Sequence, residues 1–201
     1  MTPPKTTTTL ALALMLALAS GCQTQTRLFQ PDTLQGWSTL NGGDWTVQDG
    51  VFDGTKDAAI DEHCLLLSDR EFADFRLSLE YKALHGNSGF YFRLTPAENG
   101  LGFAGYHAEI DAGGTNAGGL YDVAVDWLHK PDEALLQQAF RPGKWNTMTI
   151  ESIGQDIKVW LNGHLTTELT NDRSASGRLG VQLHAGEATR IQLKNLRVTE
   201  L

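Results

Sequence analysis

Apolar and polar residues alternate along several segments of this chain. Between Phe75 and Lys82 the odd-numbered positions are Phe, Leu, Leu and Tyr, and the even-numbered positions are Arg, Ser, Glu and Lys. Such a period of two predicts a β-strand with one buried face and one face in water. The same alternation recurs at residues 157–161, 179–183 and 191–198.

Turn signals separate these segments. Residues 157–161 end at Asn162-Gly163, the strongest short hairpin signal, because both residues tolerate positive φ. We expect only one helical stretch, around residues 133–138. Short strands joined by glycine-rich turns predict an all-β fold, a sandwich or jelly roll.

The N-terminus has the anatomy of a secretory signal peptide. Lys5 precedes an apolar run at residues 10–18, and small residues at 19–21 precede Cys22. The run is shorter than the ~20 residues of a membrane-spanning helix, so a permanent span is the weaker interpretation. Residues 1–21 are therefore predicted to be removed as a signal peptide.

A cysteine after a small-residue triplet resembles the bacterial lipobox, in which the cysteine is lipidated. Ala19 departs from that pattern, where Leu is usual, so simple secretion stays open as the alternative. Gln23 after Cys22 indicates the outer membrane by the same resemblance. We expect an envelope lipoprotein attached to the membrane only through lipidated Cys22.

The remaining length of about 180 residues suits one domain. We predict a short tether at 22–27 and a single domain at 28–201. Cys64 then has no partner for an intrachain disulfide and, beside leucines at 65–67, is expected to be a buried apolar residue. The formal charge of −8 argues against a nucleic-acid partner, because phosphate binding needs clustered Lys and Arg.

Strand alternation alone selects a candidate site. Within residues 106–111, His107, Glu109 and Asp111 project from one face. Crowded acids raise each other's pKa and suit general acid or base work. The alternative is a solvated sheet face, but the run leads into glycines at 113–119, where a backbone can approach a ligand closely.

Two further segments contribute candidates. Tyr91 and Arg93 share a strand face, and a guanidinium with an aromatic ring suits sugar recognition, although Arg93 could instead form a structural ion pair with Glu109 or Asp111. His184 shares a face with Gln182, and it could act as an acid or be structural.

Nine motifs occur in an order that resembles the 3-keto-disaccharide hydrolase domain family. They are LQGW (34–37), WTVQDGV (45–51), LLSD (66–69), NSGFYFR (87–93), GYHAEID (105–111), GGLYD (118–122), PGKWN (142–146), WLNG (160–163) and GVQLH (180–184). The resemblance covers nearly all of residues 28–201 and implies a concanavalin-like jelly roll of two antiparallel sheets.

The resemblance also implies cleavage of glycosides whose C3 hydroxyl has been oxidised to a ketone. A C3 ketone acidifies the C2 hydrogen, so a base can remove it, the enolate can expel the leaving group, and water then adds. This route needs a base, a proton donor and a group that stabilises the enolate. The expected catalytic residues are Glu109 or Asp111 as base and His184 as acid or enolate partner. The expected substrate-binding residues are Asn87, Tyr91, Arg93, His107, Tyr121, Asp122 and Gln182.

Two departures from the family pattern stand out. Residues 123–126 are Val-Ala-Val-Asp where basic residues are common, so a substrate-binding Arg is expected to be missing. Position 107 varies in the family, and this chain has His where some members have Glu or Gln. No cofactor is expected. A divalent metal held by His107, Glu109, Asp111 and His184 is a minority alternative.

The chain contains no dinucleotide-binding glycine fingerprint, so a separate dehydrogenase is expected to produce the 3-keto substrate. Two alternatives to an enzyme stay open, a carbohydrate-binding lectin-like lipoprotein and an envelope interaction protein, because fold does not decide function. Trp37, Trp127 and Trp145 do not discriminate between them, since tryptophans in strands are more often buried than sugar platforms.

Overall fold

The computed structural model describes residues 24–98 and 102–201. The predicted signal peptide and Cys22 lie outside these residues. Within them, no helix has the length and apolar character needed to cross a membrane.

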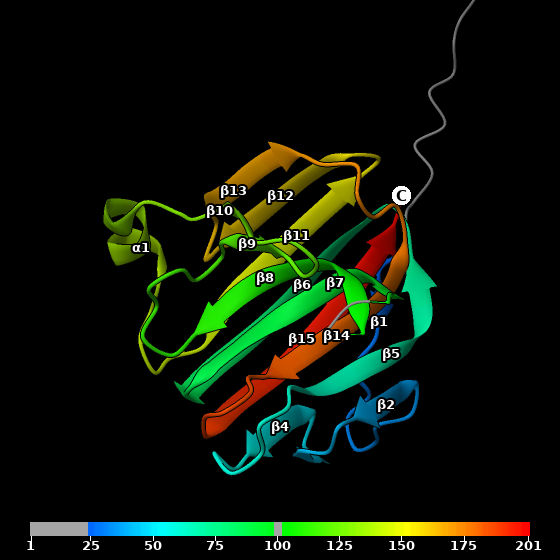
Figure 1. The fold of residues 1–201 in the computed structure, drawn as a ribbon, viewed down its shortest axis with the longest axis vertical. Coiled ribbons are helices and arrows are strands. Elements are labelled where there is room, and N and C mark those ends of the chain that lie inside the picture. The colour runs from blue at the N-terminus through cyan, green and yellow to red at the C-terminus, as the bar shows by residue number, and fades with distance from the viewer. Residues whose placement is uncertain (1–23, 99–101) are drawn as a thin grey trace, which may run out of the picture.

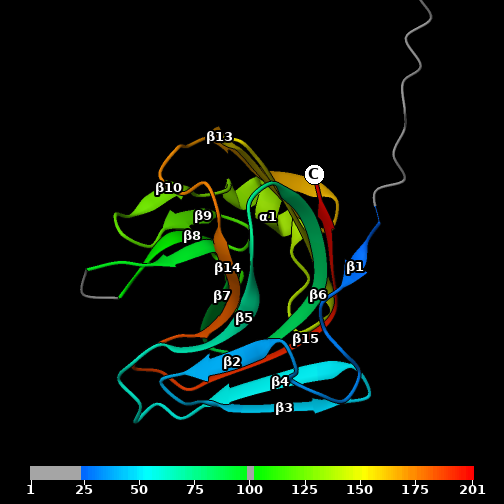
Figure 2. The same ribbon diagram turned by 90° about the vertical axis from the view of Figure 1, so that its right-hand side faces the viewer.

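Two antiparallel sheets face each other (Figures 1 and 2). The first, in spatial order, contains β13 (His164–Thr170), β12 (Asp156–Leu161), β11 (Asn146–Ile153), β6 (Phe75–His85), β15 (Thr189–Glu200), β4 (Val51–Lys56) and β3 (Asp44–Gln48), with β1 (Thr26–Arg27) paired to β15. The second contains β10 (Trp127–His129), β9 (Leu120–Asp122), β8 (Phe103–Asp111), β7 (Asn87–Pro96), β14 (Gly177–Leu183), β5 (Cys64–Phe72) and β2 (Trp37–Leu40). We call it the seven-stranded sheet; it lies nearer the viewer in Figure 1.

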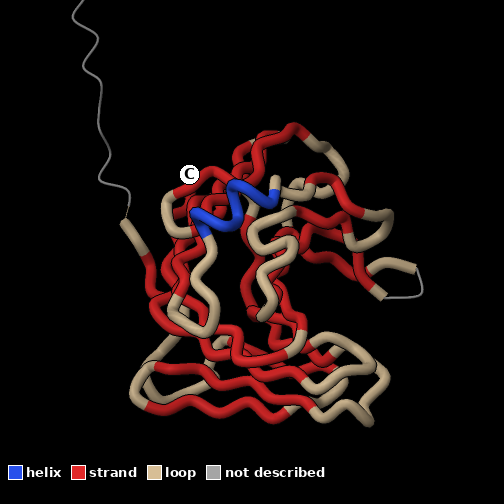
Figure 3. Tube along the Cα trace, turned by 90° about the vertical axis from the view of Figure 1, so that its left-hand side faces the viewer, coloured by secondary structure: helices blue, strands red, loops and turns tan. Residues whose placement is uncertain are grey.

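The predicted all-β sandwich is confirmed. The hairpin between β12 and β13 turns at Asn162 (φ 49°) and Gly163 (φ 86°), as the sequence predicts. Within the described residues the only helix is α1 (Glu133–Ala139), which lies at one end of the sandwich (Figure 3). The predicted domain start needs a small correction, because Thr26 and Arg27, assigned to the tether, pair with β15.

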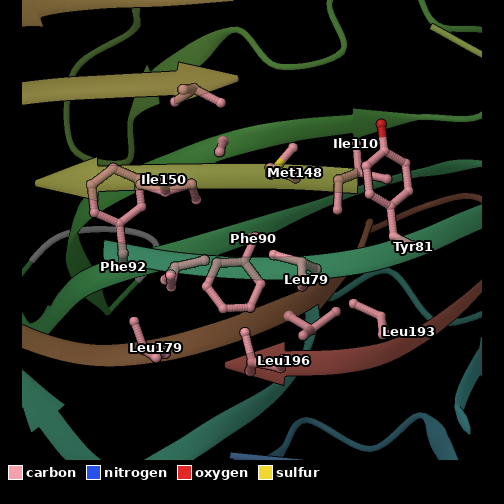
Figure 4. Packing of buried hydrophobic residues seen from close by; sticks show 14 of the residues in the cluster. Leu79, Tyr81, Phe90, Phe92, Ile110, Met148, Ile150, Leu179, Leu193 and Leu196 are labelled. Atoms are coloured by element: carbon pink, nitrogen blue, oxygen red, sulfur yellow. The ribbon is translucent and has the colours of Figure 1, made fainter. Parts of the chain in front are cut away.

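The core lies between the sheets. Inward-facing side chains such as Leu79 on β6, Phe90 on β7 and Ile150 on β11 are fully buried and pack together (Figure 4). Cys64 is buried as predicted, and its thiol donates to the Asn41 carbonyl oxygen at 3.0 Å. Burial of the inward faces fixes the strand registers and therefore decides which side chains face outward.

Candidate active site

The outer face of the seven-stranded sheet carries a polar pocket of about 370 Å³. On β8, Ala108 and Ile110 point into the core, so His107 and Glu109 project outward. The neighbouring strand β7 places Tyr91 opposite His107 and Gly89 opposite Glu109. The pocket brings together seven of the predicted site residues: Asn87, Tyr91, His107, Glu109, Tyr121, Gln182 and His184.

Glu109 is the buried acid of this pocket, with only 4% of its surface exposed. The Asn87 Nδ2 group donates a hydrogen bond to Glu109 Oε1, while Oε2 lies 3.6 Å from His107 Nδ1. Burial, together with the charges of Asp111 and Glu187, raises the pKa of the Glu109 carboxyl to about 7, although the Asn87 hydrogen bond lowers it. A carboxyl with this pKa can both take and return a proton near neutral pH.

His107 forms a neutral wall beside Glu109. Its ring lies 4.7 Å from the Tyr91 ring and 6.5 Å from the Tyr121 ring, centroid to centroid. Burial, with the nearby histidines His63 and His184, lowers the pKa of His107 to about 3. Its buried Nε2 has no hydrogen-bond partner among the described residues. This nitrogen packs against Gly89.

Gly89 makes room for that ring. A Cβ at position 89 would lie 1.5 Å from His107 Nε2, so a larger residue would displace the imidazole. The glycine thus shapes the floor of the pocket.

A hydrogen-bonded chain connects Tyr91, Gln182 and His63. Gln182 Nε2 donates to the Tyr91 hydroxyl oxygen at 2.6 Å and lies 3.1 Å from His63 Nδ1. The Ala185 N–H also donates to His63 Nδ1 at 3.0 Å, so this nitrogen is an acceptor and the ring proton belongs on Nε2. Burial lowers the pKa of His63, with the nearby His184 lowering it further. The neutral tautomer of His63 is therefore favoured.

The Tyr91 hydroxyl accepts from Gln182, which leaves its own proton free to donate. Burial raises the pKa of Tyr91, so the hydroxyl stays protonated. Tyr91 O–H and His63 Nε2–H are thus two neutral donors on one side of the pocket.

His184 lies beside His63, at the end of this hydrogen-bonded series that is farther from Tyr91. Its Nδ1 lies 2.8 Å from the Ala185 carbonyl oxygen and 3.3 Å from Glu187 Oε1, and its ring meets the His63 ring edge-on at 4.8 Å. These contacts engage Nδ1 and leave Nε2 for a ligand.

Two predicted acids serve the backbone instead of lining the pocket. Asp111 accepts from the Gly113 and Thr115 N–H groups at 2.7 and 3.0 Å, which closes the glycine-rich loop. Asp122 accepts from the Ala124 N–H at 2.9 Å. Asp111 follows Glu109 on the same strand face, as predicted, but its oxygens are used locally. The structure therefore separates Glu109 from Asp111 as the candidate base.

Arg93 corrects the prediction most clearly. Its φ of 50° at a bulge in β7 breaks the strand alternation, so its side chain leaves the face that Tyr91 occupies. The guanidinium is fully buried and donates to the carbonyl oxygens of Ala73, Gly154 and Ser174 and to Asp74 Oδ1. Arg93 is an ion-pair residue, but its partner is Asp74 and its place is outside the pocket.

Four lining residues were not among the predicted site residues: His63, Asn116, Val123 and Trp127. His63 comes from the segment between β4 and β5, where no periodicity marks it. Trp127 packs edge-on against Tyr121 at 5.6 Å and forms an aromatic wall. Trp37, by contrast, is only 9% exposed and packs against Phe29 in the core.

The four residues considered for a metal do not form a ligand set. Among the described residues no group of three or more His, Cys, Asp or Glu side chains is arranged to hold a metal ion. Asp111 is drawn away by its own loop.

Comparison with known proteins agrees with this fold. The family model of the 3-keto-alpha-glucoside-1,2-lyase-like domain matches residues 24–199. Among curated proteins, none matches the chain.

Similar solved structures include enzymes and binding modules. A candidate glycosyl hydrolase from Parabacteroides distasonis ATCC 8503 has a TM-score of 0.67 and 20% identity, over 89% of this chain and 95% of that one. The carbohydrate-binding module CBM66 from Bacillus subtilis has a TM-score of 0.64 and 17% identity, over 82% and 96% of the two chains. The Crh5 transglycosylase, in complex with NAG, has a TM-score of 0.61 and 14% identity, over 88% and 83%. These likenesses show a shared fold.

Proposed function

Since the chain belongs to the 3-keto-alpha-glucoside-1,2-lyase-like domain family, a group with a glycosyl hydrolase-like, carbohydrate-active fold, we propose that it cleaves 3-keto-glycosides. The observation that carries the proposal is Glu109, a buried carboxyl in the polar pocket whose pKa is raised to about 7. A base of this strength suits the acidified C2 hydrogen of a 3-keto sugar.

In the first step Glu109 takes the C2 proton. The C2–H bond breaks, its electron pair enters the enolate that includes the C3 oxygen, and the proton binds the carboxylate. Asn87 holds Oε1, which leaves Oε2 as the oxygen that receives the proton. Tyr91 O–H and His63 Nε2–H are the donors for the enolate oxygen, and neutral donors preorganised by Gln182 suit a charge that develops only during reaction.

In the second step the enolate electrons form the C1–C2 double bond while the bond from C1 to the glycosidic oxygen breaks. His184 Nδ1 keeps its proton in the hydrogen bond to the Ala185 carbonyl oxygen, so the imidazolium form of His184 supplies the proton to the departing oxygen through Nε2. The oxygen of a water molecule then bonds to C1, the water gives one proton back to His184 Nε2, and Glu109 returns its proton to C2. The net change is hydrolysis, and it needs no second catalytic carboxylate, unlike ordinary glycosidases.

The second candidate is a sugar-binding module without catalysis. Tyr121 and Trp127 favour it, because their perpendicular rings line the same pocket and an aromatic face can stack on a pyranose.

The test is incubation of the domain with 3-keto-trehalose or 3-keto-sucrose, with and without EDTA. The proposal expects cleavage by the wild type, loss of about 10³-fold or more in Glu109→Gln, and full activity in Glu168→Gln, a matched change at an exposed position of β13 in the other sheet. Binding without cleavage of either compound would favour the sugar-binding module. EDTA-sensitive cleavage would bring back the metal alternative.

The cellular setting is proposed on the sequence alone. A lipid anchor at Cys22 would hold the domain at the outer membrane, and a separate dehydrogenase would supply the ketone. Palmitate labelling of the wild type, lost in Cys22→Ala, tests the anchor.

A further inference from the structure

A second hollow of about 330 Å³ adjoins the polar pocket. The two share His63, Tyr91 and Val123, so they form one continuous groove on the outer face of the seven-stranded sheet. The hollow lies over β7, β5 and β2, and β14 runs between β7 and β5 (Figure 1). We call it the side hollow.

The floor of the side hollow is apolar, although it belongs to an outer sheet face that would ordinarily be polar. Leu65, Leu94 and Val123 are at most 6% exposed, form one cluster with Tyr91, and have Leu40 packed against them. This cluster is separate from the main core between the sheets.

Polar groups beside this floor are largely engaged, apart from Tyr91 O–H and His63 Nε2–H, which are assigned above to the keto-sugar in the polar pocket. Asn41 Nδ2 donates to the His63 carbonyl oxygen at 3.2 Å, and the Asn41 carbonyl oxygen accepts from the Cys64 thiol. His63 Nδ1 accepts from the Ala185 N–H. A second sugar, with several hydroxyls to satisfy, would therefore lose hydrogen bonds to water when it entered this hollow.

The rim is acidic. Asp61 and Glu62 line the hollow and are exposed. Two carboxylates at the entrance disfavour an anionic group and tolerate a neutral or cationic one.

We propose that the side hollow binds the leaving group of the glycoside, and that this leaving group is a planar apolar ring, neutral or cationic, instead of a second sugar. The inference rests on the proposed function, because the polar pocket is taken to hold the keto-sugar. The substrate class is then 3-keto-glycosides of aromatic aglycones, for which a volume of about 330 Å³ is adequate.

The kinetic test compares 3-keto phenyl glucoside with 3-keto-trehalose. We expect kcat/KM of the wild type to favour the phenyl compound at least tenfold. Leu40→Asn, which places an amide beside the floor, and Leu40→Trp, which fills the hollow, should each reduce that preference about tenfold. Leu165→Asn, at an exposed position of β13 in the other sheet, should leave the preference unchanged. An unchanged preference in both folded Leu40 variants, or a wild type that prefers the disaccharide, would overturn the proposal.

A binding measurement separates this proposal from the proposed function. Calorimetry with unoxidised phenyl glucoside requires no cleavage, and it should show at least tenfold tighter binding than trehalose in both the wild type and Glu109→Gln. If no keto-glycoside is cleaved but this difference in binding is found, the side-hollow proposal is supported and the proposed function fails. Equal binding of the two compounds would overturn the side-hollow proposal even if cleavage occurs. A 4-carboxyphenyl glucoside should bind several-fold more weakly than the phenyl compound, and equally tight binding would contradict the role of the acidic rim.

Discussion

Removing the amide of Asn87 should move the pH dependence of catalysis upward. Asn87 Nδ2 donates to Glu109 Oε1, and this hydrogen bond stabilises the ionised carboxyl against the burial that raises its pKa to about 7. A hydrogen bond to a charged group contributes about 1.5–3 kcal/mol, and one pKa unit corresponds to about 1.4 kcal/mol. In Asn87→Ala, kcat/KM should therefore begin its rise about one to two pH units higher than in the wild type.

The assay is kcat/KM for a 3-keto-glycoside between pH 5 and 10. The wild type should lose activity as pH falls through about 7, because the base becomes protonated. Asn116→Ala is the matched control, an asparagine of the same pocket whose removal should leave the acid limb in place. An acid limb in Asn87→Ala that is unmoved, or displaced to lower pH, would refute the role of Glu109 as the titrating base.

Three further predictions follow from the same contacts. Arg93→Met should lower the free energy of unfolding by about 3 kcal/mol, measured in urea, because the buried guanidinium holds three carbonyl groups and Asp74, whereas kcat/KM below the melting transition should change little. Gly89→Ala should abolish activity, because the new Cβ would clash with the His107 ring, whereas circular dichroism should show that the fold is retained. Normal activity in this variant would contradict the role of Gly89 in shaping the pocket floor. The pKa of Glu109 is about 7 in the folded state and 4.5 ordinarily, so the protonated carboxyl stabilises the fold fully below pH 4.5, and this stabilisation is lost as pH rises through 7. The free energy of unfolding, measured in urea, should therefore decline over this range by about 3 kcal/mol less in Glu109→Gln than in the wild type. An identical decline in both proteins would count against the raised pKa.

The alternation of apolar and polar residues predicted the all-β fold and the sheet face on which two of the site residues lie. Alternation in β8 correctly placed His107 and Glu109 on the outer face, and the Asn162-Gly163 hairpin has the positive φ angles it predicts. These features depend on a period of two and on local turn chemistry, which neighbouring residues determine.

Features that depend on backbone irregularity or long-range packing escaped that reasoning. Arg93 leaves the expected face because of a left-handed φ at a bulge, and Asp111 turns its oxygens to the loop that follows it. His63 reaches the site through its hydrogen bonds with Ala185 and Gln182, more than a hundred residues away in sequence. No spacing in one sequence reports such a contact.

The most direct test of the account is the fate of the C2 hydrogen. The wild type should be incubated with a 3-keto-glycoside in D₂O, and the sugar product examined by proton NMR. If Glu109 removes that hydrogen and exchanges it with solvent before returning a proton, the product carries deuterium at C2, and Glu109→Gln forms neither deuterated product nor deuterated substrate. A substrate that carries deuterium at C2 should also be cleaved several-fold more slowly by the wild type. A product that keeps its original hydrogen at C2, with no such isotope effect, would contradict the account, because the glycosidic bond would then have broken without any proton leaving that carbon.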